Sequence, residues 1–160
     1  METQWAGAVD NGDFICIDTY SGNGLLGRDT EGVSEILGAG ENNENLGCAV
    51  IRALAASREI TLDEYSGYFN WEKRKASYTL WVNSLMQQFG YRTRKALFRN
   101  MRSCSIAVDD SSILFCPSHH EKLEAWSGDG ISKDDYVVLP FDSSPADIGA
   151  ALRLAFSRCT

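Results

Sequence analysis

The chain of 160 residues lacks paired cysteine motifs, proline-rich segments and long apolar runs. Its five cysteines (16, 48, 104, 116 and 159) contain no C-x-x-C spacing, so neither a disulfide framework nor a structural zinc site is expected. No apolar stretch approaches the roughly 20 residues that cross a bilayer, and the first residues do not resemble a secretory signal. Three prolines and a hydrophobic fraction of 44% argue against disorder. We therefore expect one soluble cytoplasmic domain, residues 1–160, without a membrane partner.

Recognisable catalytic patterns are also missing. The sequence has no G-x-S-x-G elbow, and His119-x-Glu121 is not followed by the P-C-x-x-C that a zinc deaminase needs. On a helix, His120 and Glu124 would share a face, as metal ligands or an acid–base pair would, but no third ligand has a recognisable spacing. We expect surface or capping histidines where a hairpin meets a helix, with no catalytic residue, metal or cofactor. A small metal-dependent hydrolase that uses His119, His120 and Glu124 is the alternative.

One glycine pattern invites a nucleotide-binding interpretation. Gly22, Gly24 and Gly27 follow the apolar run 14–17 with the spacing G-x-G-x-x-G. A dinucleotide site needs a parallel β-α-β unit whose helix begins at the glycines. Here the preceding strand is predicted to pair antiparallel, residues 25–32 show no helical stripe, and the surrounding charge is negative. The glycines are therefore expected to form a bend.

The net charge of −7 is unevenly distributed along the chain. Residues 1–44 contain nine acidic residues and one basic residue, whereas residues 45–103 contain ten basic and four acidic residues. Such blocks favour oppositely charged partners. The basic run 92–102 interleaves its cations with Tyr91 and Phe98, a pattern typical of nucleic-acid binding. In an acidic protein these cations are expected to neutralise intramolecular carboxylates, so no nucleic-acid partner is predicted; a nucleic-acid-binding module is the alternative.

Local patterns predict an α+β fold in which antiparallel hairpins form a sheet with packed helices. Two hairpins are predicted, one joining strands 6–9 and 14–17 through an Asn-Gly type I′ turn, the other joining strands 104–108 and 113–116. Apolar residues at helical spacing predict three helices, near 44–57, 71–89 and 145–157.

The first and last predicted helices resemble each other in sequence. Segments 35–54 and 137–156 superpose with an offset of 102 residues, each with an apolar triplet, a polar loop and a helix. This similarity predicts an internal strand–loop–helix repeat in which Gly47 and Gly149 have related surroundings and allow close packing. Chance similarity between two amphipathic helices is the alternative.

Several stretches resemble the contact-dependent growth inhibition immunity proteins, a bacterial family. They are FICIDTYSGNGLL, LGCAVIRALAASR, YRTRKALFRNMRSCSI, the segment 117–120, and YVVLPFDSSPADIGAALRLAFSRC. The resemblance implies a cytoplasmic protein, not an enzyme, that binds and neutralises the C-terminal toxin domain of a surface effector delivered by neighbouring cells. Such toxins are commonly nucleases, which tend to be basic, in keeping with the acidic first third. The family supplies no catalytic motif to carry over.

Binding a basic toxin would call for carboxylates that steer the encounter and aromatic side chains that anchor it. Two acidic–aromatic clusters suit this role, one around the glycine bend and one before Trp71. The alternative is that these carboxylates pair with the protein's own basic middle. The predicted toxin-binding residues are Asp18, Tyr20, Asp29, Glu31 and Glu35 in the first cluster, and Asp63, Glu64, Tyr65 and Tyr68 in the second.

Overall fold

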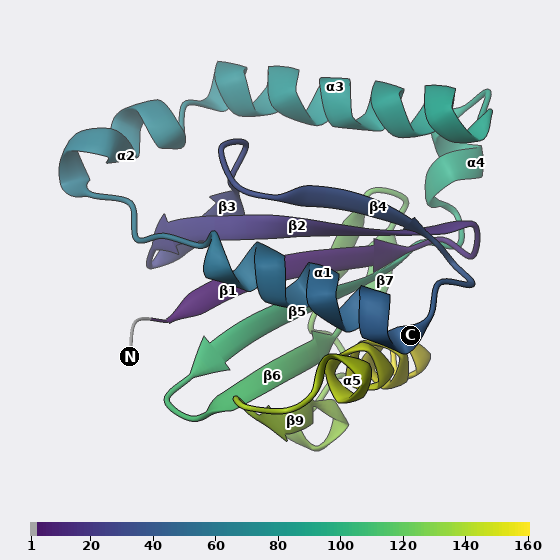
Figure 1. Ribbon diagram of the computed structural model, residues 1–160. Coiled ribbons are helices and arrows are strands. Elements are labelled where there is room, and N and C mark those ends of the chain that lie inside the picture. The colour runs from purple at the N-terminus through teal and green to yellow at the C-terminus, as the bar shows by residue number, and fades with distance from the viewer. Residues whose placement is uncertain (1–2) are drawn as a thin grey trace.

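The computed structural model describes residues 3–160, so residues 1–2 of the predicted domain lie outside the described residues. A seven-stranded antiparallel sheet has the order β3-β2-β1-β5-β6-β9, and β4 pairs with β2 beside β3 (Figure 1). The strands are β1 (Gln4–Asp10), β2 (Phe14–Asn23), β3 (Leu25–Arg28), β4 (Ser34–Gly38), β5 (Arg102–Asp109), β6 (Ser112–Pro117), β7 (His119–Lys122), β8 (Ala125–Ser127) and β9 (Val137–Pro140). The helices are α1 (Asn43–Ala55), α2 (Leu62–Tyr68), α3 (Trp71–Phe89), α4 (Arg94–Phe98) and α5 (Pro145–Ser157), with a 3₁₀ turn at Lys133–Asp135. The predicted α+β class is confirmed.

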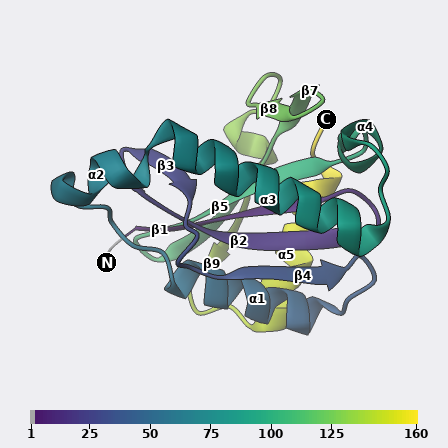
Figure 2. The same cartoon turned by 90° about the horizontal axis from the view of Figure 1, so that it is seen from above.

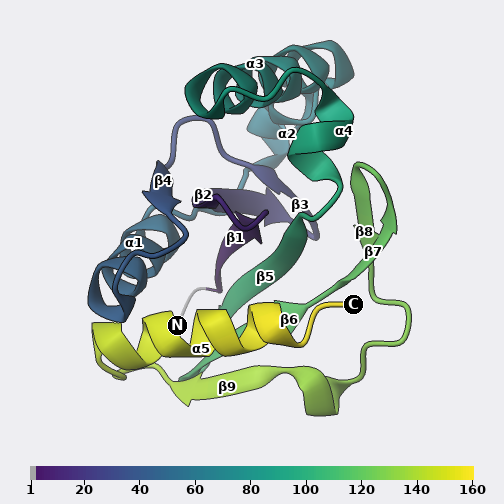
Figure 3. The ribbon, with the colours of Figure 1, turned by 90° about the vertical axis from the view of Figure 1, so that its right-hand side faces the viewer.

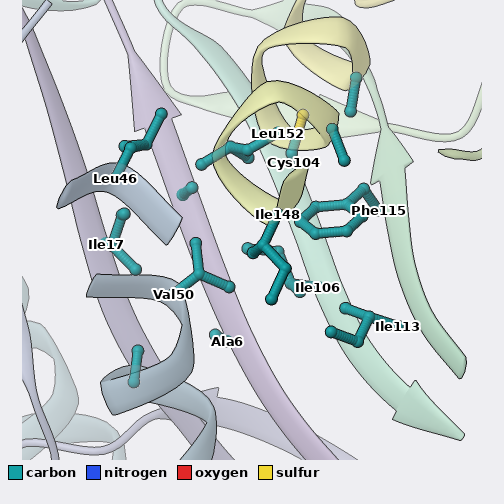
Figure 4. Close-up of a cluster of buried hydrophobic side chains, with 14 of the residues drawn as sticks. Ala6, Ile17, Leu46, Val50, Cys104, Ile106, Ile113, Phe115, Ile148 and Leu152 are labelled. Atoms are coloured by element: carbon teal, nitrogen blue, oxygen red, sulfur yellow. The ribbon is translucent and has the colours of Figure 1, made fainter. Parts of the chain in front are cut away.

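Helices cover both faces of the sheet. Figure 3 shows α1 and α5 on one side and α3 with α4 on the other. Strand β2 is buried on both sides: Ile15 and Ile17 point into the core under α1 and α5, whereas Phe14 and Cys16 point into a second core under α3 and α4. Figure 4 shows the first core, in which side chains of the two helices meet those of β1, β2, β5 and β6. Burial on both faces explains why residues 14–17 are continuously apolar and do not alternate.

Both predicted hairpins are present, with one difference in turn type. Strand β1 pairs antiparallel with β2, and β5 with β6. Within the first loop only Gly12 has a positive φ (96°), so the predicted type I′ turn, which needs two such residues, is wrong. The Asn11 side chain instead accepts a hydrogen bond from the backbone N–H of Asp13 (3.1 Å). The amide of Gly12 donates to Asp10 (2.8 Å). Side-chain acceptors therefore hold a three-residue loop.

The predicted internal repeat is present in three dimensions. Strands β4 and β9 lie beside β2 and β6 in equivalent halves of the sheet, and each leads into a helix of 13 residues, α1 or α5. A Cβ atom on Gly47 would lie 1.7 Å from the carbonyl oxygen of Pro145, and one on Gly149 would lie 1.9 Å from that of Asn43. The offset of 102 residues relates Gly47 to Gly149 and Asn43 to Pro145, so the two contacts are equivalent and the helices approach each other symmetrically. Each glycine allows backbone contact that any side chain would prevent.

The three predicted helices correspond to α1, α3 and α5, and the bounds of α3 agree with the prediction at both ends. The short helices α2 and α4 and the hairpin β7–β8 were not predicted. Their seven, five, four and three residues are too short to carry a periodic apolar pattern. Within residues 3–160, no helix is both long enough and apolar enough to cross a membrane.

Candidate functional site

A cavity lies where α2 and the beginning of α3 cover the hairpin β2–β3. Figure 2 shows these helices above β3 at one end of the molecule. The cavity has a volume of about 770 Å³, within the range of ligand and peptide pockets. Tyr20 and Arg28 contribute from the hairpin, and Trp71, Arg74 and Tyr78 from α3. The wall therefore combines aromatic rings with cationic groups.

Arg58 organises one side of the cavity through three carboxylates. Its Nε donates to Asp29 Oδ2 (2.9 Å), Nη1 to Glu64 Oε1 (3.0 Å) and Nη2 to Glu31 Oε2 (3.2 Å). Asp29 is buried, and its Oδ2 also accepts a hydrogen bond from Ser21 Oγ (2.7 Å). One guanidinium thus connects the loop after β3 to the first turn of α2. Charge-assisted hydrogen bonds of this kind are stronger than neutral ones.

These contacts change the acid–base properties of Arg58 and Glu64. Partial burial acts to lower the pKa of Arg58, but hydrogen bonds to Asp29 and Glu64 outweigh it and raise this pKa. The pKa of Glu64 is lowered, first by hydrogen bonds from the backbone and side chain of Thr61 and then by Arg58. Thr61 and Glu64 form a capping box that begins α2. The capping box and the ion cluster therefore share the carboxylate of Glu64. Both sets of contacts favour its charged state throughout the neutral pH range.

Two further arginines stack on aromatic rings around the cavity. The Arg28 guanidinium lies 3.9 Å from the centre of the Trp81 ring, and that of Arg74 lies 4.4 Å from the Tyr68 ring. Among the described residues, the buried Nε atoms of both arginines have no hydrogen-bond acceptor. Arg28 Nε is 3.8 Å from Asp18 Oδ1, which is longer than a hydrogen bond. Both Nε atoms are buried inside the molecule, so the two guanidinium groups act here mainly as cation–π partners of the rings.

The three glycines of the apparent nucleotide motif build the hairpin beside this cavity, as the sequence predicted. Gly24 has a φ of 82° and forms the turn between β2 and β3. A Cβ atom on Gly22 would lie 1.9 Å from the carbonyl oxygen of Leu25, across the same turn. A Cβ atom on Gly27 would lie 2.4 Å from the Arg74 guanidinium. The glycines thus permit a tight hairpin and close approach of an arginine.

The cavity brings together five of the nine predicted toxin-binding residues. They are Tyr20, Asp29, Glu31, Glu64 and Tyr68.

The remaining four predicted residues lie outside the lining. Asp18 is buried beside Arg28, and Glu35 forms a two-pronged ion pair with Arg52 of α1 (2.8 and 2.9 Å). Asp63 and Tyr65 lie on the exposed surface of α2. Four of the predicted carboxylates are thus bound to arginines of residues 52–58 (Asp29, Glu31, Glu35 and Glu64). These four carboxylates therefore follow the alternative stated above, in which acidic residues pair with the protein's own basic segment.

Several lining residues were missed by sequence reasoning. Arg58 and Arg74 were counted only as part of the basic middle segment, and Trp71 only as a neighbour of the second cluster. The capping box Thr61-x-x-Glu64 is a sequence signal that would have located α2. No local signal marks Arg58 as the partner of Asp29, because these residues meet only in the folded chain.

The structure does not bring the two histidines and Glu124 to a common centre. They lie on and between strands β7 and β8, so the predicted hairpin-to-helix junction is wrong. His119 Nδ1 contacts Thr160 Oγ1 (2.7 Å), whereas the His120 ring stacks on Trp126 with the ring centres 4.8 Å apart. Within residues 3–160, no group of three His, Cys, Asp or Glu side chains is arranged to hold a metal ion. These contacts stabilise the hairpin.

Glu124 belongs to a separate polar cluster. Its Oε1 accepts hydrogen bonds from Tyr78 of α3 and Arg94 of α4, each at 2.8 Å. Burial, followed by the neighbouring carboxylate, raises the pKa of Tyr78. The cluster ties the β7–β8 hairpin to the helices above it and contains neither histidine.

The basic run 92–102 is partly used inside the molecule. Arg94 pairs with Glu124, and Arg102 pairs with Asp10 (3.1 Å). Phe98, which would have to stack on a base in a nucleic-acid site, is fully buried in the second core. The interleaved pattern is therefore explained in part by a short helix whose apolar side chains face inward.

Comparison with known proteins decides the family. Residues 4–159 match the family described as CDI immunity protein. The chain belongs to the CDI immunity protein family. Immunity protein CdiI-YPIII of Yersinia pseudotuberculosis serotype O:3 (strain YPIII) is 39% identical over 173 residues, which cover 99% of this chain and 97% of that protein. The resemblance inferred from sequence is confirmed over nearly the whole immunity protein.

Solved structures support the same assignment. This immunity protein superposes on a chain of the CdiA-CT/CdiI toxin and immunity complex from Yersinia pseudotuberculosis with a TM-score of 0.92 and 38% identity, covering 100% of this chain and 99% of that chain. A protein of unknown function from Neisseria meningitidis also gives a TM-score of 0.92, at 40% identity, covering 99% and 96% of the two chains. The fold is therefore shared with an immunity protein that forms a complex with a toxin.

Proposed function

We propose that this CDI immunity protein binds the C-terminal toxin domain of its cognate CdiA effector and neutralises it in the cytoplasm. Its family membership and its similarity to a chain of a CdiA-CT/CdiI complex support this role. The cavity under α2 and α3 supports this region as the toxin-binding site, because five predicted toxin-binding residues line it. The protein acts by binding and not by catalysis.

The chemistry of the cavity suits a protruding segment of the toxin. Trp71 keeps 75% of its surface exposed at the beginning of α3, which makes it an aromatic anchor for an interface. Arg28 and Arg74 line the cavity and add positive charge to its wall. Arg58 holds Asp29, Glu31 and Glu64 in place before the partner arrives, which lowers the entropy lost on binding.

The overall charge supports a basic toxin, and we propose a nuclease. The immunity protein carries a net charge of −7, so its long-range field attracts a positively charged domain. The cavity wall itself carries more cations than carboxylates, since Lys73 and Lys75 add to the three arginines. Charge therefore steers the encounter over long range, whereas rings and directed hydrogen bonds hold the toxin at the cavity.

We expect Trp71→Ala to weaken binding of the cognate toxin domain by about 30-fold, which corresponds to about 2 kcal/mol for an interface hot spot. The tryptophan lines the cavity, and its ring is available to a partner. Isothermal titration calorimetry with a catalytically inactivated toxin domain measures the change. Growth of cells that express the active toxin together with the unaltered protein or with Trp71→Ala measures protection.

Leu80→Ala is the matched control for this substitution. Leu80 lies on the same helix with 70% of its surface exposed, but it is outside the cavity lining. We expect toxin affinity and protection to remain unchanged in this variant. Equal loss of binding in both variants would contradict docking of the toxin at the cavity. Absence of toxin binding by the unaltered protein would overturn the proposed function.

A further inference from the structure

Two thiols meet beneath α5, far along the chain from each other. Cys104 lies on β5 with its side chain buried toward α5, as Figure 4 shows. Cys159 follows the end of α5 and is only partly buried. The two sulfur atoms are 3.6 Å apart. Cys159 Sγ also lies 3.5 Å from the carbonyl oxygen of Ser103, so the thiol is held against β5 by more than one contact.

The two thiols have different acid–base properties. A hydrogen bond from Cys104 lowers the pKa of Cys159 to about 7, although partial burial acts in the opposite direction. The same hydrogen bond and burial raise the pKa of Cys104. Near neutral pH, Cys159 is therefore partly thiolate, whereas Cys104 keeps its proton. A thiolate is the reactive form of cysteine, and partial exposure gives it access to a small oxidant.

We propose that Cys104 and Cys159 form a site of oxidative modification, at which a hydroperoxide converts the two thiols into an intramolecular disulfide. The sulfur atoms must approach from 3.6 Å to about 2.05 Å, a small displacement for a pair already in contact. Cys159 lies beyond the capping residue Arg158, so its backbone can adjust without unwinding α5. The other three cysteines are Cys16 in the second core, Cys48 on α1 and Cys116 on β6.

The chemistry requires one equivalent of hydroperoxide. The Cys159 thiolate attacks the peroxide oxygen and breaks the O–O bond, which gives a sulfenic acid and, from hydrogen peroxide, water after the departing hydroxide takes up a proton. Cys104 then loses its proton, and its sulfur attacks the sulfenic sulfur of Cys159. The S–S bond forms as the S–O bond breaks, and a second water leaves. Two thiols are oxidised and one peroxide is reduced.

Mass spectrometry of the whole chain tests this site. We expect reduced protein treated with hydrogen peroxide and then with N-ethylmaleimide to yield a linked pair of peptides containing Cys104 and Cys159, while Cys48 and Cys116 are alkylated. The rate should rise as pH passes through about 7, because the attacking thiolate forms over that range. The thermal midpoint should increase on oxidation and return with dithiothreitol, since the link restricts the unfolded chain.

Variants separate this pair from general thiol oxidation. Cys159→Ser alters a partly exposed position and is expected to abolish the linked peptides and the rise in thermal midpoint. Cys48→Ser, at another partly exposed thiol, is expected to change neither. In Cys104→Ser, a dimedone adduct on Cys159 should report the trapped sulfenic acid. Oxidation of Cys159 in the unaltered protein without linkage to Cys104, or linkage of Cys104 to a cysteine other than Cys159, would overturn the proposal.

Discussion

Gly47→Ala and Gly149→Ala are each expected to lower the free energy of unfolding by about 3 kcal/mol, at the upper end of the cost of overpacking a core. A Cβ atom at either position would lie less than 2 Å from a carbonyl oxygen of the opposite helix, at Pro145 or Asn43. Only separation of α1 from α5 relieves this overlap, and separation opens the core beneath both helices. Urea unfolding followed by tryptophan fluorescence measures the effect.

The double variant gives a sharper result than either single one. Once one alanine has moved the helices apart, the second meets less overlap, so the combined cost should be smaller than the sum. Gly67→Ala is the matched control, because a Cβ atom there meets no atom within 4 Å and alanine favours a helix over glycine. Strict additivity of the two substitutions, or destabilisation by Gly67→Ala, would show that the symmetric helix contact is wrongly described.

Arg58→Ala should have the second large effect, a loss of about 2–3 kcal/mol in the free energy of unfolding. The substitution leaves the buried carboxylate of Asp29, with 1% of its side chain exposed, without its cation and near Glu31 and Glu64. Removing one partner from a wholly buried pair costs about 3–5 kcal/mol. The expected loss is smaller because Arg58 keeps 35% of its side chain exposed to screening water.

Two variants check the origin of this loss. Arg58→Ala combined with Asp29→Asn should recover about half of the lost stability, because the buried position no longer carries an uncompensated charge. Arg52→Ala removes the comparable exposed pair with Glu35 and should have little effect on unfolding. If Arg52→Ala costs as much as Arg58→Ala, or if Asp29→Asn brings no recovery, burial of the charge is not the cause.

Much of the fold could be predicted from sequence because its signals are local. The apolar stripe of Tyr78, Val82 and Leu85 indicated α3, and the glycine at position 90 ends this helix with a φ of 72°. The repeat was visible because the same small residue is needed at two equivalent helix contacts. The edge strand β3 was not predicted, since its pairing with β2 depends on long-range register and carries no alternating pattern.

The candidate site was predictable only in part. Tyr20 and Tyr68 were selected as aromatic residues beside carboxylates, and both line the cavity. The sequence could not show that Arg58 binds three of those carboxylates, because the partners come from the loop after β3 and from α2. Charge counted along the chain therefore overstated the negative charge presented by this surface. Neutralisation is a property of the folded arrangement.

Amide hydrogen exchange tests the central claim most directly, that the cavity under α2 and α3 is where this immunity protein binds its toxin. Exchange is compared between the protein alone and the protein saturated with the inactivated cognate toxin domain. We expect slower exchange in residues 28–31, in α2 and at the beginning of α3, with no change in β9 and α5. Slower exchange confined to β9 and α5, with residues 28–31 and α2 unchanged, would contradict the claim.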